Sequence, residues 1–423
     1  VAVFNSMPRI ELLALRPEQL RERIRTVLAL EGKSEVRVAV HLDPLARGAF
    51  VLVAVPKERF SNELSSQIEA RLMAQLAARF VLESRLALDE ASHVRLHFYF
   101  APSGPTVRAV PEVELQAEVS SLLRTWEDRL RAALIERYPA EHAQELARLY
   151  LPAFPASYRA ATDIATALAD IANLEHVRLS GAPEVDLAKA PESSEEPQAG
   201  VVKLYLPGEP LVLSDFLPLL ENLGFRVLSQ DLVVVEVAPV GRVQIHSFSV
   251  LDRRGLPLDV RDLAPRMKPA IALLYAGKLD NDGLNALVLR AGLTWRQADL
   301  LRAYARHAVQ LKLASSRETI VQAIVEAPAS ARALWEYFQA RFDPSLPAPP
   351  AERERGLLAE CSQRFEASLE AVPHIAQDRL LRALFAVVQA TVRTSYFVPH
   401  PEPVEPGPIA LKFDGRRLPA FGP

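Results

Sequence analysis

The chain has 423 residues, of which 49% are hydrophobic and 24% charged, so it is long enough for about three domains with buried cores. Its 49 Lys and Arg against 52 Asp and Glu give a net charge of −3. This balance argues against a nucleic-acid-binding protein, which would carry a basic surplus. The single cysteine, Cys361, excludes an intrachain disulfide and a cysteine-cluster zinc site, and it favours a cytoplasmic protein.

Glycine spacing excludes the common nucleotide-binding motifs. The two closest of the 16 glycines, Gly277 and Gly283, are six positions apart. Neither G-x-G-x-x-G nor G-x-x-x-x-G-K can therefore be formed. The apolar run 49–55, which no other run exceeds, is far shorter than the roughly 20 residues that cross a bilayer, so no membrane partner is expected. Because the chain starts at Val1, we expect a segment of a longer protein.

The first patterned block, 34–104, predicts a small α+β unit. Alternating apolar residues at 36–42 and 94–100 indicate half-buried strands, and the apolar run 49–55 indicates a central strand. Residues 1–33 are expected to be the end of a preceding segment plus a helix. A helix covering the sheet is predicted from four apolar residues at every fourth position: Leu64, Ile68, Leu72 and Leu76.

Residues 112–181 predict a helical segment, beginning with one continuous apolar helix face from Leu115 to Leu130. The stretch 182–200 (APEVDLAKAPESSEEPQAG) is acidic and rich in Pro and Ser. Since no apolar period is visible in it, a mobile linker is predicted.

A second α+β unit is predicted at 201–262, followed by a helical segment at 263–397 with a proline-rich break at 343–350. The tail 398–423 contains the start of a strand. The order of sheet, helices, sheet and helices predicts the α+β fold class.

The second unit contains the candidate effector site Ser214, Asp215 and Gly224. Ser214 or Asp215 is predicted to cap a helix that follows a strand, and Gly224 to end it. Free N–H groups at such a helix start favour an anion such as an amino-acid carboxylate. The alternative is a helix cap without a ligand.

A second candidate face is formed by His93, Arg95 and His97, which point to one side of their strand. It is either a basic face that binds a carboxylate or a nucleotide, or a polar face turned to solvent or to a neighbouring domain. The second interpretation is favoured. A zinc pair is disfavoured because the two histidines lie on a strand and lack the H-E-x-x-H pattern.

Asp299, Arg302 and Arg306 lie at i, i+3 and i+7 on one face of a predicted helix, 295–310, and Arg296, Arg302 and Arg306 are its candidate docking residues. A charge run of this kind is usually a solvated helix face. The alternative is docking against another domain or subunit, and composition does not separate the two. Nowhere does the sequence present a complete set of catalytic residues.

Several blocks are similar to a known family. The chain resembles the N-terminal, non-catalytic region of the large bacterial NAD-dependent glutamate dehydrogenases. The similar stretches are LSDFLPLLENLGFRVL (213–228), NDGLNALVLRAGLTWRQADLLRAYARHAVQ (281–310) and RTSYF (393–397).

The resemblance implies ACT-like units at 34–104 and 201–262, and a tail that leads into a catalytic domain beyond 423. It implies that the parent converts L-glutamate and NAD to 2-oxoglutarate, ammonia and NADH. This segment would then hold no catalytic, cofactor or metal site and be inactive, with NAD bound by the missing catalytic domain. Its expected roles are to contact that domain and other subunits of a homo-oligomer, and to sense a small effector such as an amino acid. The alternatives are a ligand-free structural arm and a free-standing amino-acid-sensing regulator.

Overall fold

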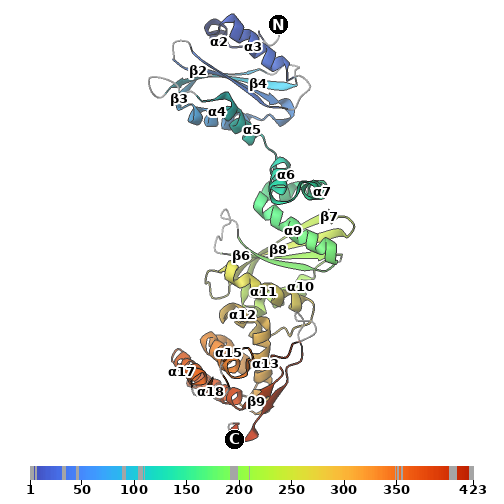
Figure 1. Ribbon diagram of the computed structural model, residues 1–423, viewed down its shortest axis with the longest axis vertical. Helices are drawn as coiled ribbons and strands as arrows, with labels where there is room; N and C mark the ends of the chain where they lie inside the picture. Colours follow the sequence, from blue (N-terminus) through green and yellow to red (C-terminus); the bar gives the residue numbers. More distant parts are fainter. Residues whose placement is uncertain are drawn as a thin grey trace. The chain divides into compact units, whose positions relative to one another are not determined.

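The computed structural model divides into two compact units, Val1–Ala133 and Leu134–Pro423, which are described one at a time (Figure 1). The residues that it describes are 4, 7–30, 35–43, 47–87, 92–102, 108, 110–190, 199–208, 210–347, 349, 352–353, 356–399 and 407–418.

The first unit contains a four-stranded antiparallel sheet with the order β1-β2-β4-β3. Its strands are β1 (Arg37–Leu42), β2 (Ala49–Pro56), β3 (Ala78–Ala87) and β4 (His93–Pro102). Strand β2 is an inner strand and is buried along its whole length, as its apolar sequence predicts.

Helices cover both faces of this sheet (Figure 1). They are α4 (Asn62–Gln75) and α5 (Glu112–Leu122) on one face and α2 (Arg9–Ala14) and α3 (Pro17–Leu28) on the other, while η1 (Lys57–Arg59) joins β2 to α4. Strand β2 serves both faces, because Val51 and Val53 join a core with α4 and α5, whereas Phe50 and Leu52 face α2 and α3.

Two features of the first unit differ from the sequence prediction. Strand β3 was not predicted; register shifts at Ala78/Phe80 and Val81/Glu83 break the alternation that would reveal it. The helix expected to continue from Leu115 to Leu130 is two helices, α5 and α6 (Trp126–Arg137), because Thr125 and Asp128 cap the second one reciprocally. Helix α5 packs on the sheet and so extends the predicted unit.

The second unit contains another antiparallel sheet, with the order β5-β6-β8-β7. Its strands are β5 (Glu184–Lys189), β6 (Gly200–Pro207), β7 (Phe225–Val237) and β8 (Gly241–Asp252). Helices α10 (Leu213–Asn222) and α11 (Val260–Tyr275) pack on one face, and α9 (Ile164–Ser180) contacts β5 and β6 from the other. The fold is therefore α+β, as predicted.

Strand β5 corrects the prediction of a linker at 182–200. Val185 and Leu187 are buried in the core of the second sheet, and β5 pairs with β6 along its length. The strand was missed because only two apolar side chains alternate within a stretch dominated by Pro, Ser and Glu. The rest of the predicted linker at 191–198 lies outside the described residues.

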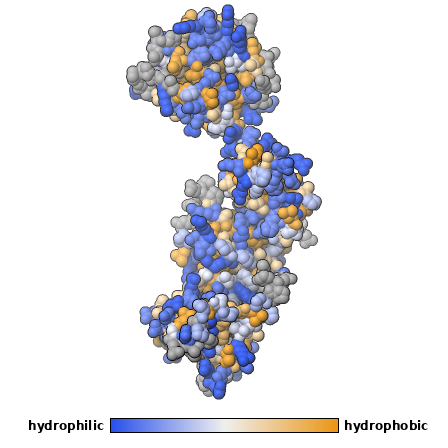
Figure 2. Space-filling model, in the orientation of Figure 1, coloured by the Kyte–Doolittle hydropathy of each residue, from blue (hydrophilic) through white to orange (hydrophobic). Residues whose placement is uncertain are grey.

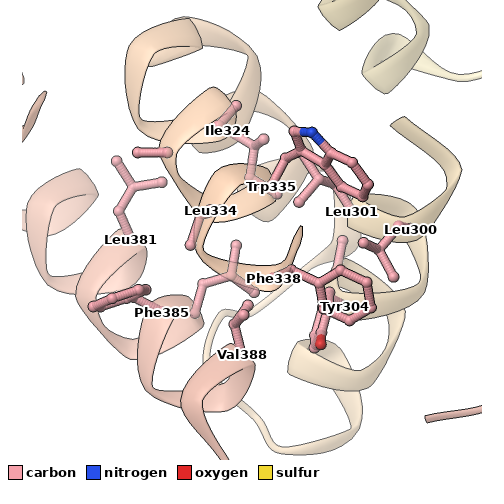
Figure 3. Packing of buried hydrophobic residues seen from close by; sticks show 14 of the residues in the cluster. Leu300, Leu301, Tyr304, Ile324, Leu334, Trp335, Phe338, Leu381, Phe385 and Val388 are labelled. Carbon is pink, nitrogen blue, oxygen red and sulfur yellow. The ribbon is translucent and has the colours of Figure 1, made fainter. Parts of the chain in front are cut away.

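Helices before and after the second sheet complete this unit. They are α7 (Ala140–Tyr150), α8 (Ala156–Ala161), η2 (Gly283–Ala286), α12 (Leu287–Arg290), α13 (Trp295–Gln310), α14 (Arg317–Glu326), α15 (Pro328–Phe342), α17 (Leu357–Leu369) and α18 (Ile375–Gln389). In Figure 3, the ring of Phe338 on α15 packs between Tyr304 of α13 and Val388 of α18. Aromatic and branched side chains of these helices fill the core.

The C-terminal part adds a short hairpin-like pair, β9 (Thr391–Thr394) and β10 (Leu411–Phe413), followed by η3 (Gly415–Arg417). Strand β10 confirms the predicted strand start in the tail. Cys361 is buried in the helical core, where burial raises the pKa of its thiol. On the face shown in Figure 2, hydrophobic residues are dispersed among hydrophilic ones.

Candidate functional site

The predicted effector residues Ser214, Asp215 and Gly224 do not meet in one place. Ser214 and Asp215 are exposed in the first turn of α10, whose N-cap is Val212 without a side-chain cap. The prediction that Ser214 or Asp215 caps this helix is therefore wrong. Gly224 does end it, as predicted, with a φ of +93° that favours glycine. Because the helix has 10 residues, its two ends are about 15 Å apart.

The predicted polar face of β4 is covered by the chain itself. His93, Arg95 and His97 are 4%, 1% and 1% exposed, so they face neither solvent nor another domain, contrary to the favoured interpretation. Helices α2 and α3 cover this face of the sheet (Figure 1). His97 Nδ1 is 3.0 Å from Oε2 of Glu11, a residue of α2. The carboxylate at this face is thus the chain's own.

Arg23 of α3 completes this buried cluster. Its guanidinium pairs with Glu11 and donates a 2.8 Å hydrogen bond to the carbonyl of Phe50 in β2. Burial lowers the pKa of Arg23 to about 10, still far above neutral pH. The three side chains therefore hold α2 and α3 on the sheet. His93 is used separately, since its Nε2 lies 2.9 Å from the carbonyl of Glu35.

Arg302 is the centre of a second buried cluster, within the second unit. Its side chain is fully buried, so the solvated-face interpretation is wrong for this residue. The guanidinium donates to Asp282 (2.9 Å), Asp299 (2.6 Å) and Asn285 (2.7 Å). Burial lowers its pKa, but the bonds to Asp282 and Asp299 outweigh this effect, so the pKa lies above the usual value.

The other two candidate docking arginines also bind the chain itself. Arg306 pairs with Asp280 at the surface. Arg296 lies 5.1 Å from the ring centre of Tyr396 and donates to the Tyr396 carbonyl at 3.3 Å. The three arginines therefore fix the 280–285 loop and the chain after β9. Whether Arg296 and Arg306 also dock onto another subunit stays a prediction.

Asp170 forms a third buried cluster that the sequence did not predict. This residue of α9 is 1% exposed and accepts hydrogen bonds from Lys203 (2.6 Å), Tyr205 (2.6 Å) and the Tyr158 hydroxyl. Lys203 and Tyr205 alternate on β6 and point to the same face. An acidic residue on the apolar side of α9, beside Ile171, was the only signal for it in the sequence.

A pocket lies where the second sheet unit meets the following helices. We call it the junction pocket; its volume is about 200 Å³. Two arginines, two glutamates and two apolar residues are among those that line it: Arg253, Arg290, Glu221, Glu326, Ala286 and Val325. We call the surface formed by Ala286 and Val325 its floor. Gly224, the one predicted effector residue here, contributes backbone to its wall.

Arg290 has an unusual environment in this pocket. Within the described part of the chain its guanidinium makes no hydrogen bond, and its Nε is fully buried. Burial, and then the nearby charges of Arg254 and Arg253, lower its pKa below the usual value, whereas Asp252 and Glu326 oppose this shift. The pocket thus contains a half-buried guanidinium without an acceptor, which an anion would stabilise.

Four family models match the chain, and together they follow its units in order. All four describe parts of glutamate dehydrogenase: the ACT2 domain (37–127), helical motif 2 (133–177), the ACT3 domain (184–263) and helical motif 3 (279–344). The chain is also similar to NAD-specific glutamate dehydrogenases of three bacteria. The one of Halomonas elongata is 31% identical over 93% of this chain, that of Pseudomonas aeruginosa 28% over 99%, and that of Mycobacterium tuberculosis 29% over 94%.

The chain resembles the N-terminal region of the large NAD-specific glutamate dehydrogenases. It spans only about a quarter of these relatives, covering 24%, 26% and 25% of their lengths. The ACT3 match begins at 184, where β5 begins, which agrees with the corrected boundary. The Asp170 cluster therefore joins helical motif 2 to the ACT3 unit, and the junction pocket lies between the ACT3 unit and helical motif 3.

None of the helices in the described ranges is long and apolar enough to cross a membrane. In the same ranges, no three His, Cys, Asp or Glu side chains are grouped as metal ligands would be.

Proposed function

We propose that this chain is the regulatory and oligomerisation region of a large NAD-dependent glutamate dehydrogenase and senses a small effector such as an amino acid. In this proposal the parent enzyme converts L-glutamate and NAD to 2-oxoglutarate, ammonia and NADH in the cytoplasm. This segment itself is inactive and contacts its own catalytic domain and other subunits. The supporting observation is the junction pocket, a site of metabolite size between an ACT unit and a helical motif.

A calorimetric screen of the purified chain against the common L-amino acids tests sensing. We expect saturable binding of at least one of them. An assay of NAD reduction with L-glutamate serves as the control for inactivity, and turnover by the purified chain would contradict that part of the proposal. If no amino acid binds, sensing is rejected.

The rival function is a structural arm without a ligand. It is favoured by the sheets, since helices of the same chain lie on both faces of each one. The strand faces are thus occupied by Glu11 in one unit and Asp170 in the other. An absence of binding in the screen, together with loss of assembly when the region is deleted from the parent enzyme, would establish the structural arm instead.

A further inference from the structure

We propose that the junction pocket binds the main-chain groups of a free α-amino acid, with the carboxylate held by Arg290 and Arg253 and the ammonium group by Glu221 and Glu326. This inference rests on the proposed function and gives it a site. It places the ligand at the C-terminal end of α10, not at the first turn where Ser214 and Asp215 lie.

The first argument is the availability of the charged groups. The side chains of Arg253, Arg290 and Glu221 make no ion pair within the described ranges. Glu326 uses Oε1 to accept a 2.9 Å hydrogen bond from Gln322. Two cations and two carboxylates left over around one pocket are the complement of a zwitterion.

The second argument is the burial of Arg290. The Arg290 side chain is half-buried, and its guanidinium has no hydrogen-bond acceptor among the described residues. A buried donor without a partner is costly, and a ligand carboxylate would satisfy it. A ligand without an acceptor group would leave this donor unsatisfied.

The third argument is the size and floor of the pocket. Its volume of about 200 Å³ is below the roughly 300–1,000 Å³ of sites for drug-sized ligands, so a small metabolite is favoured. Ala286 and Val325 give the floor an apolar surface on which the carbon chain of an amino acid can rest.

The position of the pocket suggests how binding would act. Arg253 and Glu221 belong to the ACT3 unit, whereas Arg290 is the last residue of α12 and Glu326 the last residue of α14, both in helical motif 3. A ligand that contacts both sets stabilises one arrangement of the two segments. Such differential binding is the requirement for an effector.

The test uses the amino acid that binds best in the calorimetric screen, measured on the full chain and on variants. Arg290→Ala and Glu221→Gln each remove one ligand contact, and we expect each to weaken binding about 10- to 150-fold, the range of a charge-assisted hydrogen bond. Arg261→Ala, which removes an exposed arginine from the first turn of α11, is the matched control and should bind as the unaltered chain does.

The 2-oxo acid of the same carbon skeleton tests the ammonium contact, and it should bind at least about tenfold more weakly. Thermal unfolding of each variant checks the fold; Glu221 is exposed, so its variant remains informative if Arg290→Ala unfolds. Unchanged binding in Glu221→Gln and Arg290→Ala would overturn the site while leaving sensing intact. Tighter binding of the 2-oxo acid would overturn the zwitterion assignment, and an absence of binding by every amino acid would reject both proposals.

Discussion

At the scale of single residues, the second unit is held together by buried or half-buried carboxylates that each bind several donors. Asp170 accepts from a lysine and two tyrosines, and its charge keeps the pKa of Tyr205 well above the usual value after burial has raised it. Asp282 accepts from Arg302 and Arg317 and also caps η2 through the Leu284 amide. Loss of one member of such a cluster lowers the stability of the fold, because its partners stay buried without their hydrogen bonds.

We expect Asp170→Ala to lower the free energy of unfolding by about 3–5 kcal/mol, since Lys203 would remain buried without its counter-charge. Glu236→Ala is the control, because its carboxylate is 69% exposed and its pair with Arg242 lies at the surface. Urea unfolding followed by circular dichroism measures both. Equal losses in the two variants would contradict a special role for Asp170.

Sequence reasoning could identify the candidate residues but not their partners. The alternation that placed His93, Arg95 and His97 on one face was correct, but periodicity cannot show what covers a face. The partners Glu11 and Arg23 lie more than 70 positions away from His97 in the chain. Likewise, Gly224 was found from helix-end chemistry, whereas Arg290 was not predicted, because the pocket combines segments that are distant in sequence.

At the scale of elements, the strength of the local pattern decided what could be predicted. Strands β1, β2 and β4 alternate or are uniformly apolar and were predicted, and so was the helix α4. Strand β3 was missed because of its register shifts. Strand β5 was missed because composition outweighed two alternating side chains, and only pairing with β6 reveals it.

The role of β5 can be measured through Leu187. We expect Leu187→Ala to cost about 2–5 kcal/mol of stability, because its side chain is 4% exposed and packs in the core of the second sheet. The same substitution in a mobile linker would cost almost no stability. Leu179→Ala makes the same change at a side chain that is 76% exposed, and should have a small effect. If both variants unfold at the same urea concentration, β5 does not contribute to the core.

At the scale of the whole molecule, the two compact units each have their own sheet and their own buried polar cluster. The cluster of the first unit consists of Glu11, Arg23 and His97, and that of the second includes Asp170 and Lys203. The amide groups of each sheet should therefore respond only to damage in their own unit.

Hydrogen exchange followed by mass spectrometry tests this independence. Glu11→Ala leaves Arg23 buried without its counter-charge, so we expect exchange in β2 and β4 to rise about a hundredfold or more. Exchange in β6 and β8 should stay unchanged. A comparable rise in the second sheet would show that the units unfold together, and no rise in the first would show that the Glu11 contact is dispensable.

The covering of β4 by α2 also orders events during synthesis. Glu11 leaves the ribosome 86 residues before its partner His97, so the two helices are made before the surface that they cover. At a typical rate of 5–20 residues per second, this delay lasts between about 4 and 17 s. During that interval Val27 of α3 gains its partners Ala39 and Leu52 on β1 and β2, but Glu11 still lacks His97. The buried cluster of Glu11, Arg23 and His97 can therefore form only after β4 has been made, and the nascent first unit remains accessible to chaperones until then.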